Sequence, residues 1–167
     1  MRYFETSTVC SLLHSTTSTT TTASATTATP TSTASPFSVP GYVYVGMNGT
    51  QTGFMISGGK WYNTGGTPAT YTPFPSNDGS GSFALKTSKG YCAVNSTDSS
   101  LSCASAYNST ASASYFTTDG SGNLVYGGSN VWGAAAVPTG TQQGTVYAGT
   151  TGVTEPVTIQ LYWTPKS

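Results

Sequence analysis

Acidic side chains are the first candidates for chemistry in this chain of 167 residues. Beyond Pro36 there are four of them, Asp78, Asp98, Asp119 and Glu155. Two carboxylates that flank a glycosidic bond can hydrolyse it, so a pair drawn from Asp78, Asp119 and Glu155 is one candidate site. Each aspartate, however, stands in a Gly- or Ser-rich turn, where Asp commonly binds the backbone of its own loop. We therefore expect no catalytic residue among them.

Histidine is absent after Pro36, and the single His14 lies near the start of the chain. This excludes Ser-His-Asp and Cys-His catalysis and the usual histidine metal sites from the rest of the chain. The segments 78–81 and 119–122 both read Asp-Gly-Ser-Gly but lack the further acidic ligands of a calcium loop. The sequence therefore predicts no metal, no cofactor and no enzymatic activity.

Two aromatic clusters are better candidates for ligand binding. Sugar rings pack their C–H faces on Trp and Tyr, while their hydroxyls bind amide and hydroxyl side chains. Each cluster places a Trp beside a Gly-rich turn and a nearby Asn. The candidate glycan-binding residues are Trp61, Tyr62, Asn63, Asn130 and Trp132.

A disulfide is predicted between Cys92 and Cys103. A turn centred on residues 97–98 places Cys92 opposite Cys103 and Val94 opposite Leu101, all on one face of a hairpin. Cys10 is the odd cysteine; it can be a free thiol, an intermolecular link or half of a bridge to a part of the protein outside this sequence.

Three Asn-X-Ser/Thr sequons predict N-glycosylation, at Asn48, Asn95 and Asn108. Asn48 opens an Asn-Gly turn, and Asn95 lies beside the tip of the predicted hairpin, where a glycan would point into solvent. Together with the disulfide, the sequons predict an extracellular or cell-wall location.

The composition excludes several functional classes. Only 6% of residues are charged, with five Lys or Arg against five Asp or Glu, and 56 residues are Ser or Thr. Without a basic surface, nucleic-acid binding is not expected, and the few lysines are interpreted as solubilising edge residues. No apolar run is long enough to cross a membrane, and the residues that form helical bundles are scarce.

The chain divides into three segments by composition. Residues 1–14 form an unassigned tail without a visible signal peptide, which predicts that the true N-terminus lies upstream and that the chain is part of a longer one. Residues 15–36 are all Ser, Thr, Ala or Pro, which predicts a disordered, O-glycosylated stalk. Residues 37–167 hold nearly all the Gly and aromatic residues and predict one globular domain.

This domain is predicted to be all-β. Short alternating stretches are interrupted every few residues by Gly-rich turns, as in a β-sandwich or a small β-barrel. The clearest strand is 157–163, in which Val157, Ile159, Leu161 and Trp163 share one face. Three units that begin at Phe54, Phe83 and Phe116 also allow a β-trefoil.

The segment from Phe83 to Trp132 resembles, in layout, fungal secreted and cell-wall glycoproteins of the PhiA type. The shared layout is a strand that begins at Phe, a hairpin around Cys92 and Cys103, then Phe116, a Leu-Val-Tyr strand and a Trp. This chain departs from the family in having no visible signal peptide and only two cysteines in its domain. The resemblance implies a wall-associated role without defined catalysis.

The sequence thus predicts a non-catalytic extracellular or wall-associated glycoprotein module that binds polysaccharide through exposed aromatic residues. Two alternatives stay open: a glycan-active hydrolase with a carboxylate pair, and a secreted effector or surface antigen that binds a host protein.

Overall fold

The computed structural model describes residues 37–167, and these form an all-β fold, as predicted. The predicted tail and stalk, residues 1–36, lie outside the described residues. Within the described range the helical content is one short 3-10 turn, η1 (Thr110–Ser112). The strands are β1 (Gly41–Met47), β2 (Thr50–Met55), β3 (Lys60–Tyr62), β4 (Thr72–Pro75), β5 (Phe83–Thr87), β6 (Gly90–Val94), β7 (Leu101–Cys103), β8 (Tyr115–Thr118), β9 (Leu124–Val125), β10 (Trp132–Ala134), β11 (Gly144–Ala148) and β12 (Val157–Pro165).

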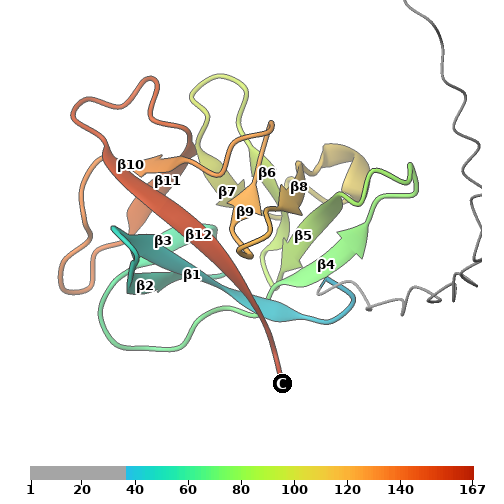
Figure 1. Cartoon of the computed structure of the whole chain (residues 1–167), viewed down its shortest axis with the longest axis horizontal. Coiled ribbons are helices and arrows are strands. Elements are labelled where there is room, and N and C mark those ends of the chain that lie inside the picture. The colour runs from blue at the N-terminus through green and yellow to red at the C-terminus, as the bar shows by residue number, and fades with distance from the viewer. Residues whose placement is uncertain (1–36) are drawn as a thin grey trace, which may run out of the picture. The chain divides into compact units, whose positions relative to one another are not determined.

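Six strands close a barrel in the order β1-β12-β10-β11-β3-β2. The barrel takes its strands from the two ends of the described chain, and Figure 1 shows β12 running beside β1. All of the strand pairs are antiparallel. Of the predicted alternatives, the barrel is therefore present.

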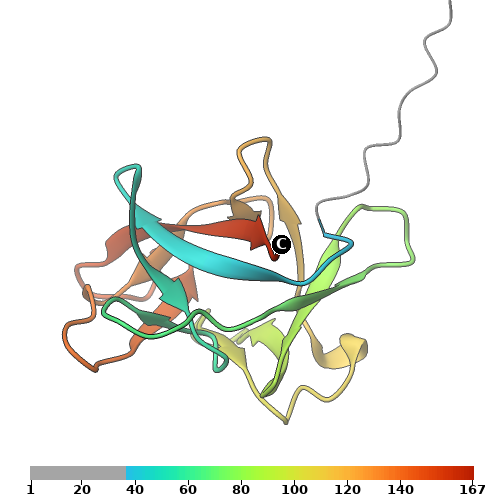
Figure 2. The ribbon, with the colours of Figure 1, turned by 90° about the horizontal axis from the view of Figure 1, so that it is seen from below.

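The last strand has the predicted alternation. Ile159, Leu161 and Trp163 are buried, Val157 on the same face is partly buried, and Thr158 on the other face is exposed. In the register with β1, Leu161 lies opposite Val45, which is also buried. Figure 2 shows these two long strands side by side along one wall of the barrel. The burial of every second side chain therefore sets the register in which β1 and β12 pair.

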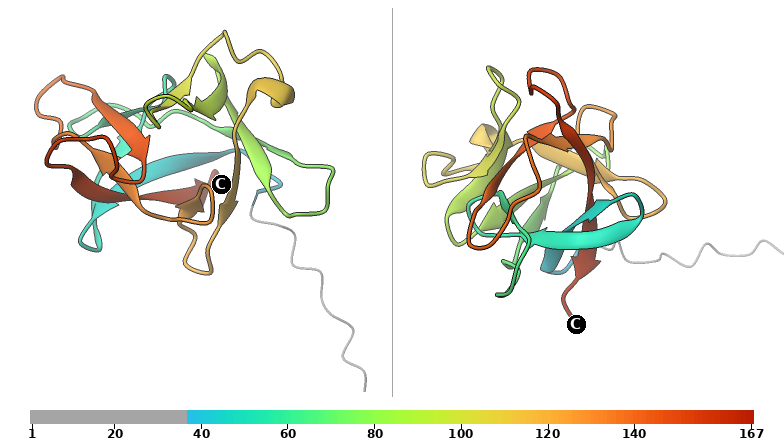
Figure 3. Two further views of the ribbon diagram at one scale, coloured as in Figure 1. Left: turned by 90° about the horizontal axis from the view of Figure 1, so that it is seen from above. Right: turned by 90° about the vertical axis from the view of Figure 1, so that its left-hand side faces the viewer.

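The middle of the chain forms a second sheet, in the order β7-β6-β5-β8-β9, with β4 paired to β5. The isolated bridges Ser100 to Tyr147 and Asn123 to Tyr162 join this sheet to the barrel strands β11 and β12. Figure 3 shows the hairpin of β4 and β5 extending away from the barrel. This hairpin carries one wall of a surface groove.

The two sheets share one core. Its largest fully buried side chains include Trp61, Trp132, Phe83 and Phe116. Phe54, by contrast, lies near the end of β2 and is half-buried, so the three Phe residues of the predicted repeat are not equivalent. Among the described residues, no helix is long and apolar enough to span a membrane.

Candidate functional site

A surface groove of about 820 Å³ lies beside the hairpin of β4 and β5. Its volume falls within the range of roughly 300–1,000 Å³ that is typical of ligand sites. Hydroxyl side chains dominate its lining, together with one lysine and one aromatic ring. The lining residues, which we call the hydroxyl groove, are Ile56, Ser57, Thr67, Ala69, Thr70, Thr72, Phe74, Lys86, Thr87 and Ser88.

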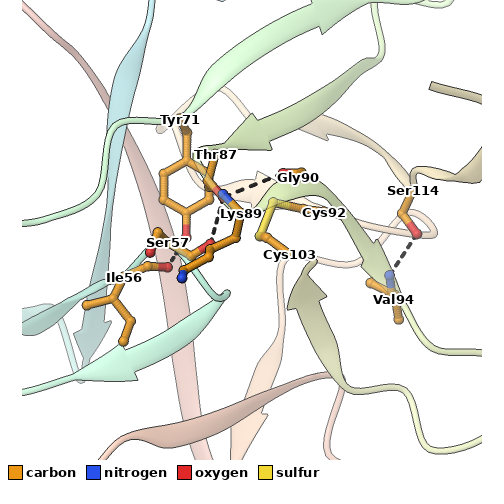
Figure 4. Close-up of a disulfide and its surroundings, with 10 residues drawn as sticks. All are labelled: Ile56, Ser57, Tyr71, Thr87, Lys89, Gly90, Cys92, Val94, Cys103 and Ser114. Atoms are coloured by element: carbon orange, nitrogen blue, oxygen red, sulfur yellow. Dashed lines mark hydrogen bonds between the residues drawn. A yellow bond between two sulfur atoms is a disulfide. The ribbon is translucent and has the colours of Figure 1, made fainter. Parts of the chain in front are cut away.

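Hydrogen bonds between distant segments hold the walls of the hydroxyl groove together. The Thr87 hydroxyl donates to the carbonyl of Ser57 at 2.6 Å and accepts the backbone N–H of Lys89 at 3.1 Å. The Tyr71 hydroxyl donates to the carbonyl of Ile56 at 2.8 Å. Figure 4 shows both contacts, with Tyr71, just before β4, and Thr87, at the end of β5, reaching toward the 56–57 segment. The groove therefore has fixed walls.

Tyr71 acts in this wall as a permanent hydrogen-bond donor. Its side chain is buried, and desolvation by burial raises the pKa of its hydroxyl far above the ordinary value. The phenol consequently keeps its proton under all ordinary conditions, and its contact with Ile56 is not a pH switch.

The ammonium group of Lys86 lies over one of two aromatic rings that pack together at the groove. Its ammonium lies 5.0 Å from the centroid of the Tyr91 ring, over the ring face. The Phe74 ring packs on the same tyrosine, with ring centroids 5.3 Å apart. Lys86 itself is exposed, as is Lys89 just beyond the rim. No carboxylate belongs to the groove lining.

The two tryptophans predicted to bind glycans lie in the core. Trp61 is fully buried, and its Nε1 donates to the carbonyl of Thr52 at 3.4 Å. Trp132 is also buried, and its Nε1 donates to the carbonyl of Leu124 at 2.9 Å. Their ring faces are therefore packed against protein and offer no platform to a sugar.

The other three candidate residues each contact a different part of the domain. Asn63 Nδ2 donates to the carbonyl of Pro138 at 2.9 Å, and Asn130 Nδ2 donates to Asp119 Oδ2 at 2.8 Å. Tyr62 is half-buried and packs against Phe54.

The candidate catalytic aspartates bind their own turns. Hydrogen bonds from Ser80 lower the pKa of Asp78, and the backbone N–H and side chain of Ser100 lower the pKa of Asp98. Asp119 accepts hydrogen bonds from the side chains of Asn123 and Asn130, which lower its pKa to about 2. Such carboxylates stay ionised at neutral pH, so none is poised to donate a proton. Within residues 37–167, no cluster of His, Cys, Asp and Glu is arranged to hold a metal ion.

The structure contains the disulfide between Cys92 and Cys103, in the predicted register. The Cα atoms are 3.9 Å apart, and Val94 lies opposite Leu101 on the same pair of strands. Figure 4 shows the disulfide joining the middle of β6 to β7. Cys10 lies outside the described residues.

Comparison with known protein families decides how the fold is interpreted. A family model described as "RNase T2-like C-terminal domain" matches residues 35–164, which is most of the chain. The chain belongs to this family.

A curated relative agrees with this assignment. A protein of Kluyveromyces lactis named "Ribonuclease T2-like" is 37% identical over 106 residues, which cover 60% of this chain and 23% of the relative. The match thus spans about a quarter of the length of that protein. No solved structure matches the chain.

The family assignment corrects the sequence-based interpretation. The resemblance to PhiA-type wall proteins is wrong, because the matched family is the RNase T2-like C-terminal domain. The predicted non-catalytic, polysaccharide-binding wall module is wrong for the same reason, and so is the conclusion that the protein is not an enzyme. The glycan-active hydrolase and the effector or antigen have no support in either comparison.

Sequence reasoning missed the hydroxyl groove. It interpreted Lys86 and Lys89 as solubilising residues and did not consider Phe74. The sequence contains a weak signal for one face of this hairpin. Thr72 and Phe74 are two residues apart on one strand, as are Ala84 and Lys86 on the next, so each pair lies on one face of its strand. No local pattern, however, indicates that the 56–57 and 67–70 segments pack against that hairpin.

Proposed function

We propose that this chain functions as the C-terminal domain of a ribonuclease and that RNA is the substrate. The observation that carries the proposal is the family match over residues 35–164. The curated relative supports it, because its name is that of a ribonuclease. RNA replaces cell-wall polysaccharide as the expected partner, and the expectation that the protein meets no nucleic acid is withdrawn.

The test is cleavage of RNA by the natural gene product that contains this chain. The protein is purified and incubated with single-stranded RNA and, in parallel, with single-stranded DNA of the same base order. We expect shortened RNA fragments and intact DNA. A mock purification from the same host without the gene controls for host ribonuclease. RNA that stays intact across acidic and neutral buffers would contradict the proposal.

We also propose that the protein matures in the secretory pathway and resides outside the cytosol. The disulfide supports this location, because disulfides persist in oxidising compartments. The sequon residues Asn48, Asn95 and Asn108 are all exposed, so an attached glycan would meet no packing obstacle.

Glycopeptide mass spectrometry of protein secreted by a eukaryotic host tests this second proposal. We expect glycans at all three asparagines, and we expect each Asn→Gln variant to lose one of them. Unmodified peptides at all three positions would count against passage through that pathway.

A further inference from the structure

We propose that the hydroxyl groove binds a segment of single-stranded RNA, with Lys86 and Lys89 facing phosphates and Phe74 stacking on a base. This inference rests on the proposed function, which supplies RNA as the substrate class. It goes further by naming the surface of the domain that binds the RNA.

Strand alternation brings the proposed contacts to one face. Thr72 of β4 pairs with Lys86 of β5, and Phe74 pairs with Ala84. The intervening Pro73 and Leu85 are buried and point to the opposite face. The hairpin therefore presents a hydroxyl, an aromatic ring and an ammonium together at the groove, while its other face packs on the core.

The distribution of charge favours a polyanion at this groove. Residues 37–167 contain four lysines and four acidic residues, so the described domain has no net charge to attract RNA as a whole. Lys86 lines the groove and Lys89 follows the lining residue Ser88, so half of these lysines are at one site. The nearest carboxylate in sequence, Asp78, lies in the loop beyond Pro75, at the far end of the hairpin, where it binds Ser80. Phosphates at the groove thus meet local positive charge.

The hydroxyl lining suits the sugar-phosphate backbone. Six of the ten lining residues are Ser or Thr. Such side chains are common partners of phosphate and ribose oxygens in nucleic-acid complexes. A ribose adds its 2′-hydroxyl, which both donates and accepts hydrogen bonds.

The aromatic surface favours single strands over duplexes. Phe74 is half-buried, and it is packed on Tyr91 with a tilted ring, which keeps it in place at the groove. Unpaired bases stack on such rings with little sequence preference, whereas the bases of a duplex are already stacked. The Lys86 ammonium over Tyr91 is held beside the same surface.

Hydrogen bonds within the protein already order the walls of the hydroxyl groove, so a ligand does not have to order them when it binds. Besides the Thr87 and Tyr71 contacts, the backbone N–H of Ala69 donates to the carbonyl of Met55 at 3.2 Å. The 67–70 segment is therefore attached to the end of β2. A preorganised site loses less conformational entropy when a ligand binds.

Fluorescence anisotropy of the full chain with a labelled 2′-O-methyl oligouridylate tests the proposal. This probe retains phosphates and bases, but its blocked 2′-oxygen cannot attack the neighbouring phosphate, so cleavage does not alter the signal. If Lys86 and Lys89 neutralise two phosphates, a plot of the logarithm of the association constant against the logarithm of the salt concentration should have a slope of about −1.4. Lys86→Gln and Lys89→Gln are each expected to weaken binding several-fold and to reduce the slope to about −0.7.

Lys60→Gln is the matched control, because it removes the same charge outside the groove. The Lys60 ammonium donates to the Thr145 hydroxyl at 3.1 Å, and a glutamine amide can keep that contact. We expect K60Q to bind the probe as the wild type does. Equal losses for K60Q, K86Q and K89Q, or wild-type slopes for both groove variants, would overturn the proposal.

Phe74→Ala and a duplex probe test the stacking contact. We expect Phe74→Ala to weaken binding of the single strand by about 5- to 150-fold. We expect wild-type protein to bind a 2′-O-methyl hairpin duplex more weakly than the single strand. Phe74→Leu, which keeps an apolar side chain, serves if the alanine variant loses its cooperative thermal transition. Equal affinity for both probes, with no effect of either Phe74 variant, would show a simple anion site and refute single-strand binding.

The two proposals fail separately. A natural gene product that cleaves RNA, together with groove variants that bind the probe normally, refutes the groove but leaves the ribonuclease function intact. A product that leaves RNA intact refutes the ribonuclease function, whatever the probe shows.

Discussion

The Thr87 hydroxyl and the Ser57 carbonyl are 2.6 Å apart and join strand β5 to the turn between β2 and β3. Thirty residues separate the two in sequence, and the contact lies in one wall of the hydroxyl groove. Thr87 is one of the few buried polar side chains of the domain. It links the barrel to the second sheet at the place where the proposed RNA contact is made.

Thr87→Val is expected to destabilise the fold. Valine keeps the branched shape but removes the donor to Ser57 and the acceptor for the backbone N–H of Lys89. Leaving these buried groups without a partner costs about 2 kcal/mol. Urea unfolding followed by tryptophan fluorescence measures the loss. Thr158→Val, at an exposed position of β12, is the control and is expected to change stability little. Equal effects of the two variants would mean that the hydroxyl contacts contribute nothing.

Gly90→Ala is expected to destabilise the start of β6. Gly90 has φ +133°, and a Cβ there would lie 2.1 Å from the carbonyl oxygen of Ala104. Both the strained backbone and the clash with main-chain atoms oppose the substitution, with a combined cost of about 3 kcal/mol. Thermal unfolding monitored by circular dichroism gives the shift in midpoint.

Gly120→Ala is the matched control for that experiment. Gly120 has no positive φ, and a Cβ there meets nothing within 4 Å. We expect its midpoint to equal or exceed that of the wild type, because alanine restricts the unfolded chain. A midpoint for Gly90→Ala as high as that of Gly120→Ala would contradict the assigned backbone geometry.

Removing the disulfide by the double substitution Cys92→Ala and Cys103→Ala is expected to lower the free energy of unfolding. The two cysteines are 11 residues apart, and closing a loop of this size stabilises a fold by about 2–3 kcal/mol in the chain-entropy model. Equilibrium unfolding with and without dithiothreitol provides an internal control. The reductant should bring the wild type to the level of the double variant and leave the variant unchanged. A wild type that is insensitive to reductant under unfolding conditions would argue against the bond.

Local patterns in the sequence predicted the local structure. The alternation of residues 157–163 and the pairing of Cys92 with Cys103 both appear in the structure, because each depends on neighbours within one strand or one hairpin. The burial of Trp61 does not follow from such local patterns. A tryptophan beside a Gly-rich turn can face either way, and only the closure of the barrel buries it.

The candidate site was harder to predict than the fold. The groove depends on Ser57, Tyr71 and Thr87, which lie on different strands or turns and meet only after the two sheets pack together. No periodicity links such positions. The family was also out of reach of composition, because low charge and abundant hydroxyls do not distinguish a wall protein from an RNase T2-like C-terminal domain.

Asp119→Asn is expected to reduce stability in a manner that depends on pH. Oδ1 of Asp119 accepts the backbone N–H groups of Ser121 and Asn123 at 2.9 Å each, and Oδ2 accepts the side-chain amides of Asn123 and Asn130. These contacts, the Asn123 side chain foremost, lower the pKa of Asp119 to about 2. An asparagine would instead place its own N–H₂ group among these donors.

The sign of the pH effect follows from the lowered pKa of Asp119. The folded state favours the carboxylate, so its contribution is fully present above the unfolded pKa of about 4 and is lost as the pH falls toward about 2. Because the side chain is partly exposed, we expect a difference of only about 1 kcal/mol between wild type and Asp119→Asn near neutral pH. Urea unfolding at a series of pH values should show this difference shrinking between pH of about 4 and about 2. Glu155→Gln removes one charge without touching this loop and should show no such convergence; a difference for Asp119→Asn that stays constant over the same range would refute the assigned role of the carboxylate.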